Sequence, residues 1–408
     1  MIGMAKAIRY SFYILLFILY IYSIKFTFFP LTGKVVMAVL GLLLWATDLM
    51  KKAILISKSD KKIISIGAIL TVWGVIVATM NSSDQYIYLE YFISLSSAFF
   101  ASYLLYKITR RDIKSLDSLL WVISIAVFIE SLITVGLRFI PSLQDFLFSI
   151  QEFQTKDSSD QDLLNLHRFI GLGEAVYFGV LPSCAIGALS TMTLLLYFKQ
   201  HHSPLLLWIV FLVICTVSFL IARYSLIIPL ICVVWYLFHF IRLGKYRKIV
   251  SFSIIGVFVL LISFSLLKIF LPEGIFDWAF ELLEEGSSSS TEDVMDWLVN
   301  THFDLVTFIF GDGLYATKYG YYKSIDIGIY RQIFYGGIIG LGLLLSLHIC
   351  ILKCCIKSCP SNSIRSFSFF LFVAYFATQL KGDKPFFDLF LLIYVFLEFL
   401  PSISKNEL

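Results

Sequence analysis

The sequence predicts an all-α polytopic membrane protein with about twelve transmembrane helices and one large extracytoplasmic loop that contains an amphipathic helix. Of its 408 residues, 59% are hydrophobic and only 15% are charged, whereas soluble domains have about 45–50% apolar and about 25% charged residues. Apolar runs near the roughly 20 residues that cross a bilayer as a helix recur along the chain. Basic residues cluster between alternate runs, as they do in cytoplasmic loops.

The apolar runs set the organisation of the chain. Residues 1–270 hold nine spans and a smaller outer loop at 141–173, residues 271–326 form the large periplasmic loop or lid, and residues 327–408 hold three more spans and a cytoplasmic tail. We place the spans at 10–29, 34–50, 63–80, 86–106, 119–140, 174–198, 205–222, 225–241, 249–270, 327–350, 364–380 and 386–400.

Charge sets the orientation of the chain in the membrane. With this map, 20 of the 32 Lys and Arg residues fall on one side, although the other side carries both of the longest loops. We therefore expect both termini in the cytoplasm and the large loop outside it. The first span is too long for a signal-peptide core and should be a retained anchor. For a bacterial protein these features predict a multi-pass inner-membrane location.

Composition excludes several classes of function. The net charge of +4 is spread over the cytoplasmic loops, so it reflects topology and predicts no nucleic-acid partner. Cys354 and Cys355 with Cys359 could suggest a metal site, but no histidine lies at zinc-finger spacing, and soft interfacial residues are the better interpretation. We therefore expect no metal and no cofactor.

Two arginines are candidates for binding a phosphate group. The smaller loop closes with His167-Arg168-Phe-Ile-Gly171, so Arg168 lies beside small residues at the head of a span. Arg223 is the only charge between the seventh and eighth spans, where a charged side chain is costly unless it is paired or functional. Guanidinium groups match phosphate oxygens well. Snorkelling to the membrane surface is the alternative for both.

The large loop is acidic and contains one predicted amphipathic helix. Between residues 271 and 326 the sequence has eleven Asp and Glu residues and only two lysines. Ser290 and Asp293 have the spacing of a capping box, and apolar side chains then recur at helical spacing through Ile309. His302 lies at the edge of this stripe and could transfer protons, although a packed or half-exposed histidine is the commoner case.

The loop ends in a glycine turn and a cluster of polar residues. Phe310-Gly-Asp-Gly313 predicts a turn, and four tyrosines follow it, which could stack on sugars or belong to the interfacial aromatic belt. Asp326 comes just before the tenth span and Arg331 lies about one and a half turns further on. This pair could be a structural ion pair. It could also be a base for an attacking hydroxyl with an arginine for the leaving group.

Three stretches together resemble the family of O-antigen polymerases and the related O-antigen ligases. They are His167-Arg-Phe-Ile-Gly171, Ala222-Arg-Tyr-Ser225, and Phe310-Gly-Asp-Gly313 followed by Asp326 and Tyr335-Gly-Gly-Ile-Ile-Gly340. The resemblance implies a metal-independent glycosyltransferase that uses oligosaccharides linked to undecaprenyl pyrophosphate, in contact with membrane lipids. A polymerase would transfer a growing glycan onto the non-reducing end of another lipid-linked repeat unit. A chain-length regulator and a flippase would be its protein partners.

The resemblance also implies roles for named residues. Arg168 and Arg223 would bind the pyrophosphate with Arg331 in support, and Asp326 would be the base, with His302 in reserve. Members of the family often carry an arginine near the start of the loop helix, whereas this chain has Glu292 and Asp293 there. The alternatives are a ligase that transfers the glycan to the lipid A core, a lipid-linked oligosaccharide flippase, and a scaffold without a reaction.

Overall fold

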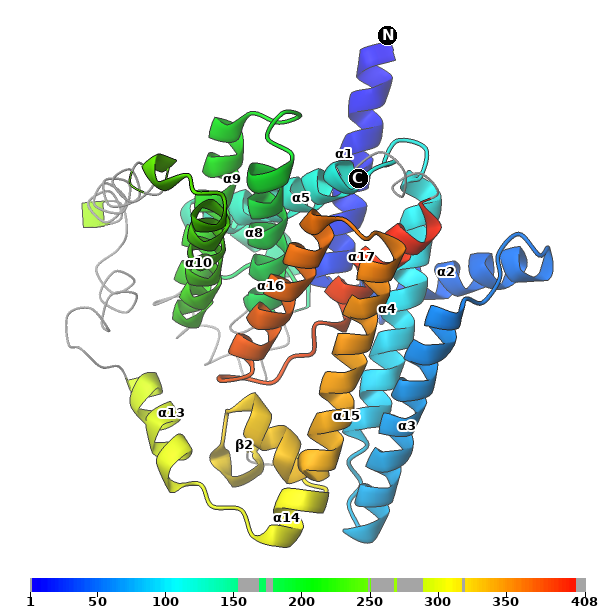
Figure 1. The fold of residues 1–408 in the computed structure, drawn as a ribbon, viewed down its shortest axis with the longest axis vertical. Coiled ribbons are helices and arrows are strands. Elements are labelled where there is room, and N and C mark those ends of the chain that lie inside the picture. Colours follow the sequence, from blue (N-terminus) through cyan, green and yellow to red (C-terminus); the bar gives the residue numbers. More distant parts are fainter. Residues whose placement is uncertain are drawn as a thin grey trace. The chain divides into compact units, whose positions relative to one another are not determined.

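The structure is a computed structural model that describes residues 2–152, 169–173, 179–248, 250, 268–269, 289–317 and 320–400. Figure 1 shows the labelled helices along the chain. The chain divides into two compact units. Unit 1 comprises Met1–Val122 and Asp293–Leu408, and unit 2 comprises Ile123–Glu292. Residues from the two ends of the chain therefore fold together in unit 1, which contains the described part of the large loop from Asp293 on and the tenth predicted span.

Eight of the described helices are long and apolar enough to cross a membrane, which confirms the multi-pass α-helical class. They are α2 (Gly33–Met50), α3 (Lys58–Met80), α4 (Ile87–Thr109), α5 (Leu116–Phe139), α8 (Val180–Tyr197), α9 (Pro204–Ile221), the stretch Arg223–Arg242 formed by η2 (Arg223–Leu226) and α10 (Ile227–Arg242), and α15 (Gly328–Ser358). Each begins and ends within a few residues of a predicted span, except that α15 continues eight residues beyond its span.

Two more helices coincide with predicted spans but are not among those eight: α16 (Asn362–Thr378) and α17 (Phe387–Phe399). A third, α1 (Ile2–Tyr22), overlaps the predicted first span, 10–29, but begins eight residues before it and ends seven residues before its end. The remaining predicted span, 249–270, lies almost wholly outside the described residues. A total of about twelve spans therefore stays a prediction. The short helix α6 (Pro141–Ile150) follows α5 directly, in a segment that we expected to be a loop.

Local sequence signals fix several of the helix starts. Ser57 and Asp60 form a reciprocal capping box at the start of α3, and the Thr32 side chain accepts a hydrogen bond from the Val35 N–H at the start of α2. Pro204 occupies the first turn of α9, where its missing N–H has no helical partner to lose. These signals define where α2, α3 and α9 begin.

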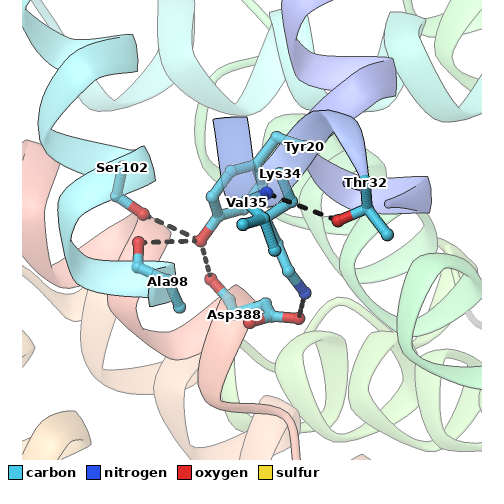
Figure 2. A network of polar contacts seen from close by, with 7 residues as sticks. All are labelled: Tyr20, Thr32, Lys34, Val35, Ala98, Ser102 and Asp388. Carbon is cyan, nitrogen blue, oxygen red and sulfur yellow. Dashed lines mark hydrogen bonds and ion pairs between the residues drawn. The ribbon is translucent and has the colours of Figure 1, made fainter. Parts of the chain in front are cut away.

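A buried polar network joins four helices of unit 1 (Figure 2). Lys34 Nζ of α2 lies 2.5 Å from Asp388 Oδ2 of α17. The Tyr20 hydroxyl of α1 lies 2.7 Å from the Asp388 carbonyl oxygen and 2.8 Å from Ser102 Oγ of α4. Charges within a membrane bundle are costly unless they are paired. This ion pair therefore favours arrangements that bring the first residues of α2 and α17 together over alternatives that would separate the two charges.

The helix that we predicted in the large loop is wrong as a single element. The chain forms α13 (Ser289–Asn300) and a separate short helix α14 (Leu305–Phe310), with a break at 301–304. Asp304 causes the break, since its Oδ1 accepts hydrogen bonds from the N–H groups of Val306 and Thr307, at 2.9 Å each. An Asp side chain that binds these N–H groups starts a new helix in preference to continuing the old one.

The predicted apolar stripe of the loop packs only in part, at Val294 and Trp297, which both belonged to it. Val294 and Trp297 contact the buried cluster of Ile325, Ile327 and Phe334, which belongs to the start of α15 and the segment before it. Leu298 and Leu305, which belonged to the predicted stripe, are 42% and 73% exposed. The packed side of the loop thus begins with Val294 and Trp297, and it covers the segment that contains Asp326.

Candidate functional site

Helix α15 is interrupted where its sequence reads Tyr335-Gly-Gly, and the glycine turn of the large loop docks on this interruption. Gly337 has φ 66° and ψ −175°, which is not a helical conformation. Such a break frees carbonyl groups that must find other partners within a membrane. The Phe334 and Tyr335 carbonyls accept from the N–H groups of Asp312 and Gly313 at 2.6 and 3.1 Å, and the Gly336 carbonyl accepts from Trp73 Nε1 at 2.8 Å.

Glycine is required at this contact because two backbones touch. A Cβ atom at Gly337 would overlap the Ile309 carbonyl, and a Cβ atom at Gly311 would overlap the backbone of Tyr335 and Gly336. Gly311 also has φ 84°, a region that favours glycine. The two glycine-rich stretches that carry the family resemblance are therefore packed against each other in unit 1.

Next to this contact lies a group of polar and aromatic side chains that we call the Arg331 cluster. It consists of Tyr91, Tyr315, Tyr321, Asp326, Arg331, Gln332 and Asp383. The connection between α16 and α17 brings Asp383 to the start of α15. Two backbone hydrogen bonds join this connection to the start of α15. The Gly382 N–H donates to the Asp326 carbonyl at 2.6 Å, and the Gln379 carbonyl accepts from the Ile329 N–H at 3.2 Å.

Arg331 lies at the centre of the cluster. Its side chain is only 6% exposed, and its Nη1 lies 3.6 Å from Asp326 Oδ1. The guanidinium carbon lies 3.7 Å from the ring centre of Tyr321 and 4.2 Å from that of Tyr315. Aromatic faces attract a cation at such distances, most strongly where water is excluded. Tyr315, Tyr321 and Asp326 thus hold the guanidinium group of Arg331 in place. Arg331 and Asp326 form the pair that the sequence suggested.

Asp383 accepts three hydrogen bonds at one oxygen. Its Oδ2 accepts from the hydroxyl groups of Tyr315 and Tyr91, at 2.8 and 3.1 Å, and from Gln332 Nε2. Burial raises the pKa of Asp383 above its usual value, while Arg331 and these hydrogen bonds oppose the rise. Burial likewise raises the pKa of Asp326, and Arg331 opposes it. Burial is the larger effect for both carboxyl groups.

The cluster has more polar atoms than its own side chains satisfy. Among the described residues, Asp326 Oδ1, Arg331 Nε, Gln332 Oε1 and Asp383 Oδ1 are buried without a hydrogen-bond partner. Buried polar groups are normally paired with protein, water or ligand. Three of these four atoms are oxygen acceptors, so they match a ligand that offers hydroxyl groups. Together with the hydroxyl groups of Tyr91 and Tyr315, they concentrate hydrogen-bonding groups at the start of α15.

The reserve base His302 lies in the segment between α13 and α14, and its side chain is exposed. Its neighbour Phe303 packs on Phe334 and Tyr330, with ring centres 4.7 and 5.2 Å apart. The structure therefore anchors the chain at Phe303 and leaves the imidazole on the surface. Asp326 is the candidate base that lies within the Arg331 cluster.

The two other predicted arginines belong to unit 2. Arg223 begins the 3₁₀ turn η2 between α9 and α10 and is partly buried, whereas Arg168 lies outside the described residues. The residue after Arg168, Phe169, is buried against Ile221 and Ala222, and the Phe169 N–H donates to the Leu220 carbonyl at 3.1 Å. The chain that follows Arg168 therefore contacts the chain that precedes Arg223.

A buried glutamate fixes this part of unit 2. Glu130 of α5 is 2% exposed, and its Oε1 accepts from the Leu172 N–H at 3.1 Å and from the Thr134 hydroxyl at 2.9 Å. Gln151 Oε1 accepts from the Gly173 N–H at 3.2 Å. These two side chains hold the short segment 169–173 against α5 and the end of α6.

Sequence reasoning missed Glu130, Gln332 and Asp383, although each carried a signal. Glu130 is an acidic residue inside an apolar run, and such residues are usually functional or paired. Asp383 lies in Lys381-Gly-Asp-Lys384, a short charged stretch between two spans, and Gln332 is a polar neighbour of Arg331. Comparison with known proteins adds no further residues, because no family model, curated protein or solved structure matches this chain.

Proposed function

We propose that this protein is an O-antigen polymerase, a metal-independent glycosyltransferase that moves a growing glycan from undecaprenyl pyrophosphate onto another lipid-linked repeat unit. The Arg331 cluster is the observation that supports this proposal best. It combines two carboxyl groups of raised pKa, tyrosine rings and buried oxygen acceptors near the first residues of a broken span. These groups suit an acceptor that presents sugar hydroxyls at the membrane surface.

Asp326 is the base of the proposed reaction. The acceptor hydroxyl oxygen attacks the anomeric carbon of the donor glycan, its proton passes to Asp326, and the bond from that carbon to the pyrophosphate oxygen breaks. Burial raises the pKa of Asp326, so its carboxylate accepts a proton more readily than an exposed one would. Gln332 Oε1 and Asp383 Oδ1 would accept hydrogen bonds from other hydroxyls of the acceptor sugar.

The leaving pyrophosphate requires cations, and we assign Arg168 and Arg223 to it, with Arg331 in support. Guanidinium groups bind phosphate oxygens with two parallel hydrogen bonds, which stabilises the charge that develops as the bond breaks. Arg331 lies 3.6 Å from Asp326 and is stacked between tyrosines. Its larger role in this proposal is therefore to orient Asp326, because much of its charge is already compensated.

The proposed setting is the bacterial inner membrane, with both termini in the cytoplasm and the site on the periplasmic face. The donor and acceptor are lipid-linked oligosaccharides, and a flippase would deliver them. A chain-length regulator is the proposed protein partner. The ligase and flippase alternatives use the same class of lipid-linked substrate, so the experiment must separate all three.

The test is the lipopolysaccharide banding pattern of a deletion strain, and the same strain complemented with the wild-type gene is the control that should regain full-length polymer. A lipid A core that carries a single repeat unit is the expected result, because ligation and export then continue without polymerisation. Bare core with accumulated lipid-linked polymer would instead identify a ligase. Bare core with precursor retained on the cytoplasmic face would identify a flippase, and an unchanged pattern would contradict all three assignments.

A further inference from the structure

The short helix α14 is unusually apolar for a segment of an extracytoplasmic loop. Its sequence is Leu-Val-Thr-Phe-Ile-Phe, and Thr307 is the one residue in it that is fully buried. Leu305 and Val306 are 73% and 67% exposed, and Phe308 and Phe310 are 40% and 41% exposed. So dense an apolar surface is costly in water, and it normally marks a contact with lipid or protein.

The contacts of α14 place it at the level of a membrane span. The ring centre of Phe310 lies 6.2 Å from the ring centre of Trp73 in α3. Trp73 precedes the last residue of α3, Met80, by seven positions, which corresponds to about 10 Å along the helix axis. The turn that follows α14 then contacts Asn81, just beyond the end of α3, where Gly311 O lies 3.4 Å from Asn81 Nδ2.

The helices on which α14 docks expose apolar side chains of the same kind. Val72 and Ile76 of α3 are 59% and 42% exposed, and Ile338 of α15, next to the Gly337 contact, is 41% exposed. These two helices are long and apolar enough to span a membrane, so their exposed apolar side chains face lipid. Phe310, one of the exposed residues of α14, packs on Trp73, which lies between Val72 and Ile76 in the sequence of α3.

We infer that α14 is inserted into the outer part of the bilayer and that membrane lipid chains cover Leu305, Val306, Phe308 and Phe310. The polar atoms around the helix fit this position. Asp304 caps its first turn, and the Thr307 hydroxyl lies 2.9 Å from Asp304 Oδ2 and 2.5 Å from Asp312 Oδ1. Both carboxyl groups thus lie on the Thr307 side, and the apolar side chains occupy the rest of the helix surface.

Bimane fluorescence in lipid nanodiscs tests this inference. All seven native cysteines are buried, so a cysteine introduced at a surface position is the one that a thiol-reactive bimane labels. The test variant is Val306→Cys. Val72→Cys on the exposed side of α3 is the matched lipid control, and Asp296→Cys on α13 is the matched water control, because a charged exposed residue belongs in water.

Nanodiscs made with brominated phospholipid chains should quench bimane at position 306 about as strongly as at position 72, and should leave the label at position 296 bright. Aqueous iodide should quench the labels in the opposite order. Quenching at 306 by iodide as strong as at 296 would show that α14 faces water. A label at 306 that neither agent quenches would show that protein covers it, and either result overturns the inference whatever reaction the protein catalyses.

Discussion

Substitution of Gly337 by alanine should destabilise the protein through two separate effects. The backbone at Gly337 has φ 66° and ψ −175°, a region that is essentially restricted to glycine, and a side chain forced into it costs about 1–3 kcal/mol. The added Cβ would also overlap the Ile309 carbonyl and the Phe310 nitrogen. Movement of this turn would strain the hydrogen bonds from Asp312 N and Gly313 N, and each buried group left unpaired costs about 1–3 kcal/mol.

The expected loss for Gly337→Ala is therefore about 3 kcal/mol or more of stability, if the strain and at least one lost hydrogen bond contribute. The chain offers a matched control in the same helix. A Cβ atom at Gly342 would have no heavy atom within 4 Å of it. Gly342→Ala should therefore stabilise α15 by about 0.5–1 kcal/mol, as alanine does in an ordinary helix interior.

The measurement is the temperature at which half of the purified protein leaves the monodisperse peak in size-exclusion chromatography, compared among wild type and the two variants in one detergent. Gly337→Ala should lower this temperature clearly, and Gly342→Ala should leave it unchanged or raise it. Equal temperatures for the two variants would refute the reasoning, because they would show that α15 can run through Gly337 as a regular helix and that the turn does not depend on the break.

Three predictions concern the proposed reaction. Asp326→Asn should lower polymer formation about 10²- to 10⁴-fold without loss of folded protein. In the wild type, the rate of polymer formation should fall as the pH decreases through the raised pKa of Asp326, because only the carboxylate form can accept a proton. Asp383→Asn keeps the shape but replaces the carboxyl group that accepts from Tyr91, Tyr315 and Gln332 by an amide, so it should lower stability by about 0.5–1.5 kcal/mol in a thermal-stability assay. A strain that makes the Arg223→Ala variant at the normal protein level should produce lipopolysaccharide with only a single repeat unit. Arg242 is exposed at the other end of α10, and a strain with the control variant Arg242→Ala should produce full-length polymer.

The pH prediction for Asp326 has a counterpart in stability. Because its pKa is raised in the folded protein, the folded state binds the proton more tightly than the unfolded chain does. Protonation of this residue therefore stabilises the fold, and that contribution is lost as the pH rises through the raised pKa. Activity and the stability contribution of Asp326 should consequently change in opposite directions with pH. Asp326→Asn should remove this residue's contribution to both dependences.

The spans could be predicted from the sequence because length, hydropathy and caps are local properties. The boundaries of α2, α3 and α9 differ from prediction by no more than five residues, and Thr32, Ser57 and Pro204 explain where they begin. The single loop helix failed for a local reason too, since Asp304 offered an alternative partner to two backbone N–H groups within an otherwise helical pattern.

The site could be predicted only where its residues are close in sequence. Arg331 follows Asp326 by five residues, with Asp326 just before α15 and Arg331 in its first turn, so their pairing could be expected. Asp383 reaches the same place through the connection of two later helices, and Tyr91 reaches it from α4. Such meetings depend on tertiary packing, and neither hydrophobic periodicity nor the charge of a single segment contains that information.

The break in α15 explains how a loop and several spans can share one site. An unbroken helix would use the Phe334, Tyr335 and Gly336 carbonyls within its own turn, and the glycine turn of the large loop would then have no backbone groups to bind. Because of the break, the Phe334 and Tyr335 carbonyls accept hydrogen bonds from the N–H groups of Asp312 and Gly313. The Gly336 carbonyl accepts from Trp73 Nε1 of α3. Arg331 precedes the break by less than two turns, so its position depends on the same contact. A variant that loosens the glycine turn should therefore also alter the geometry around Asp326, even though no residue of the turn needs to touch the substrate.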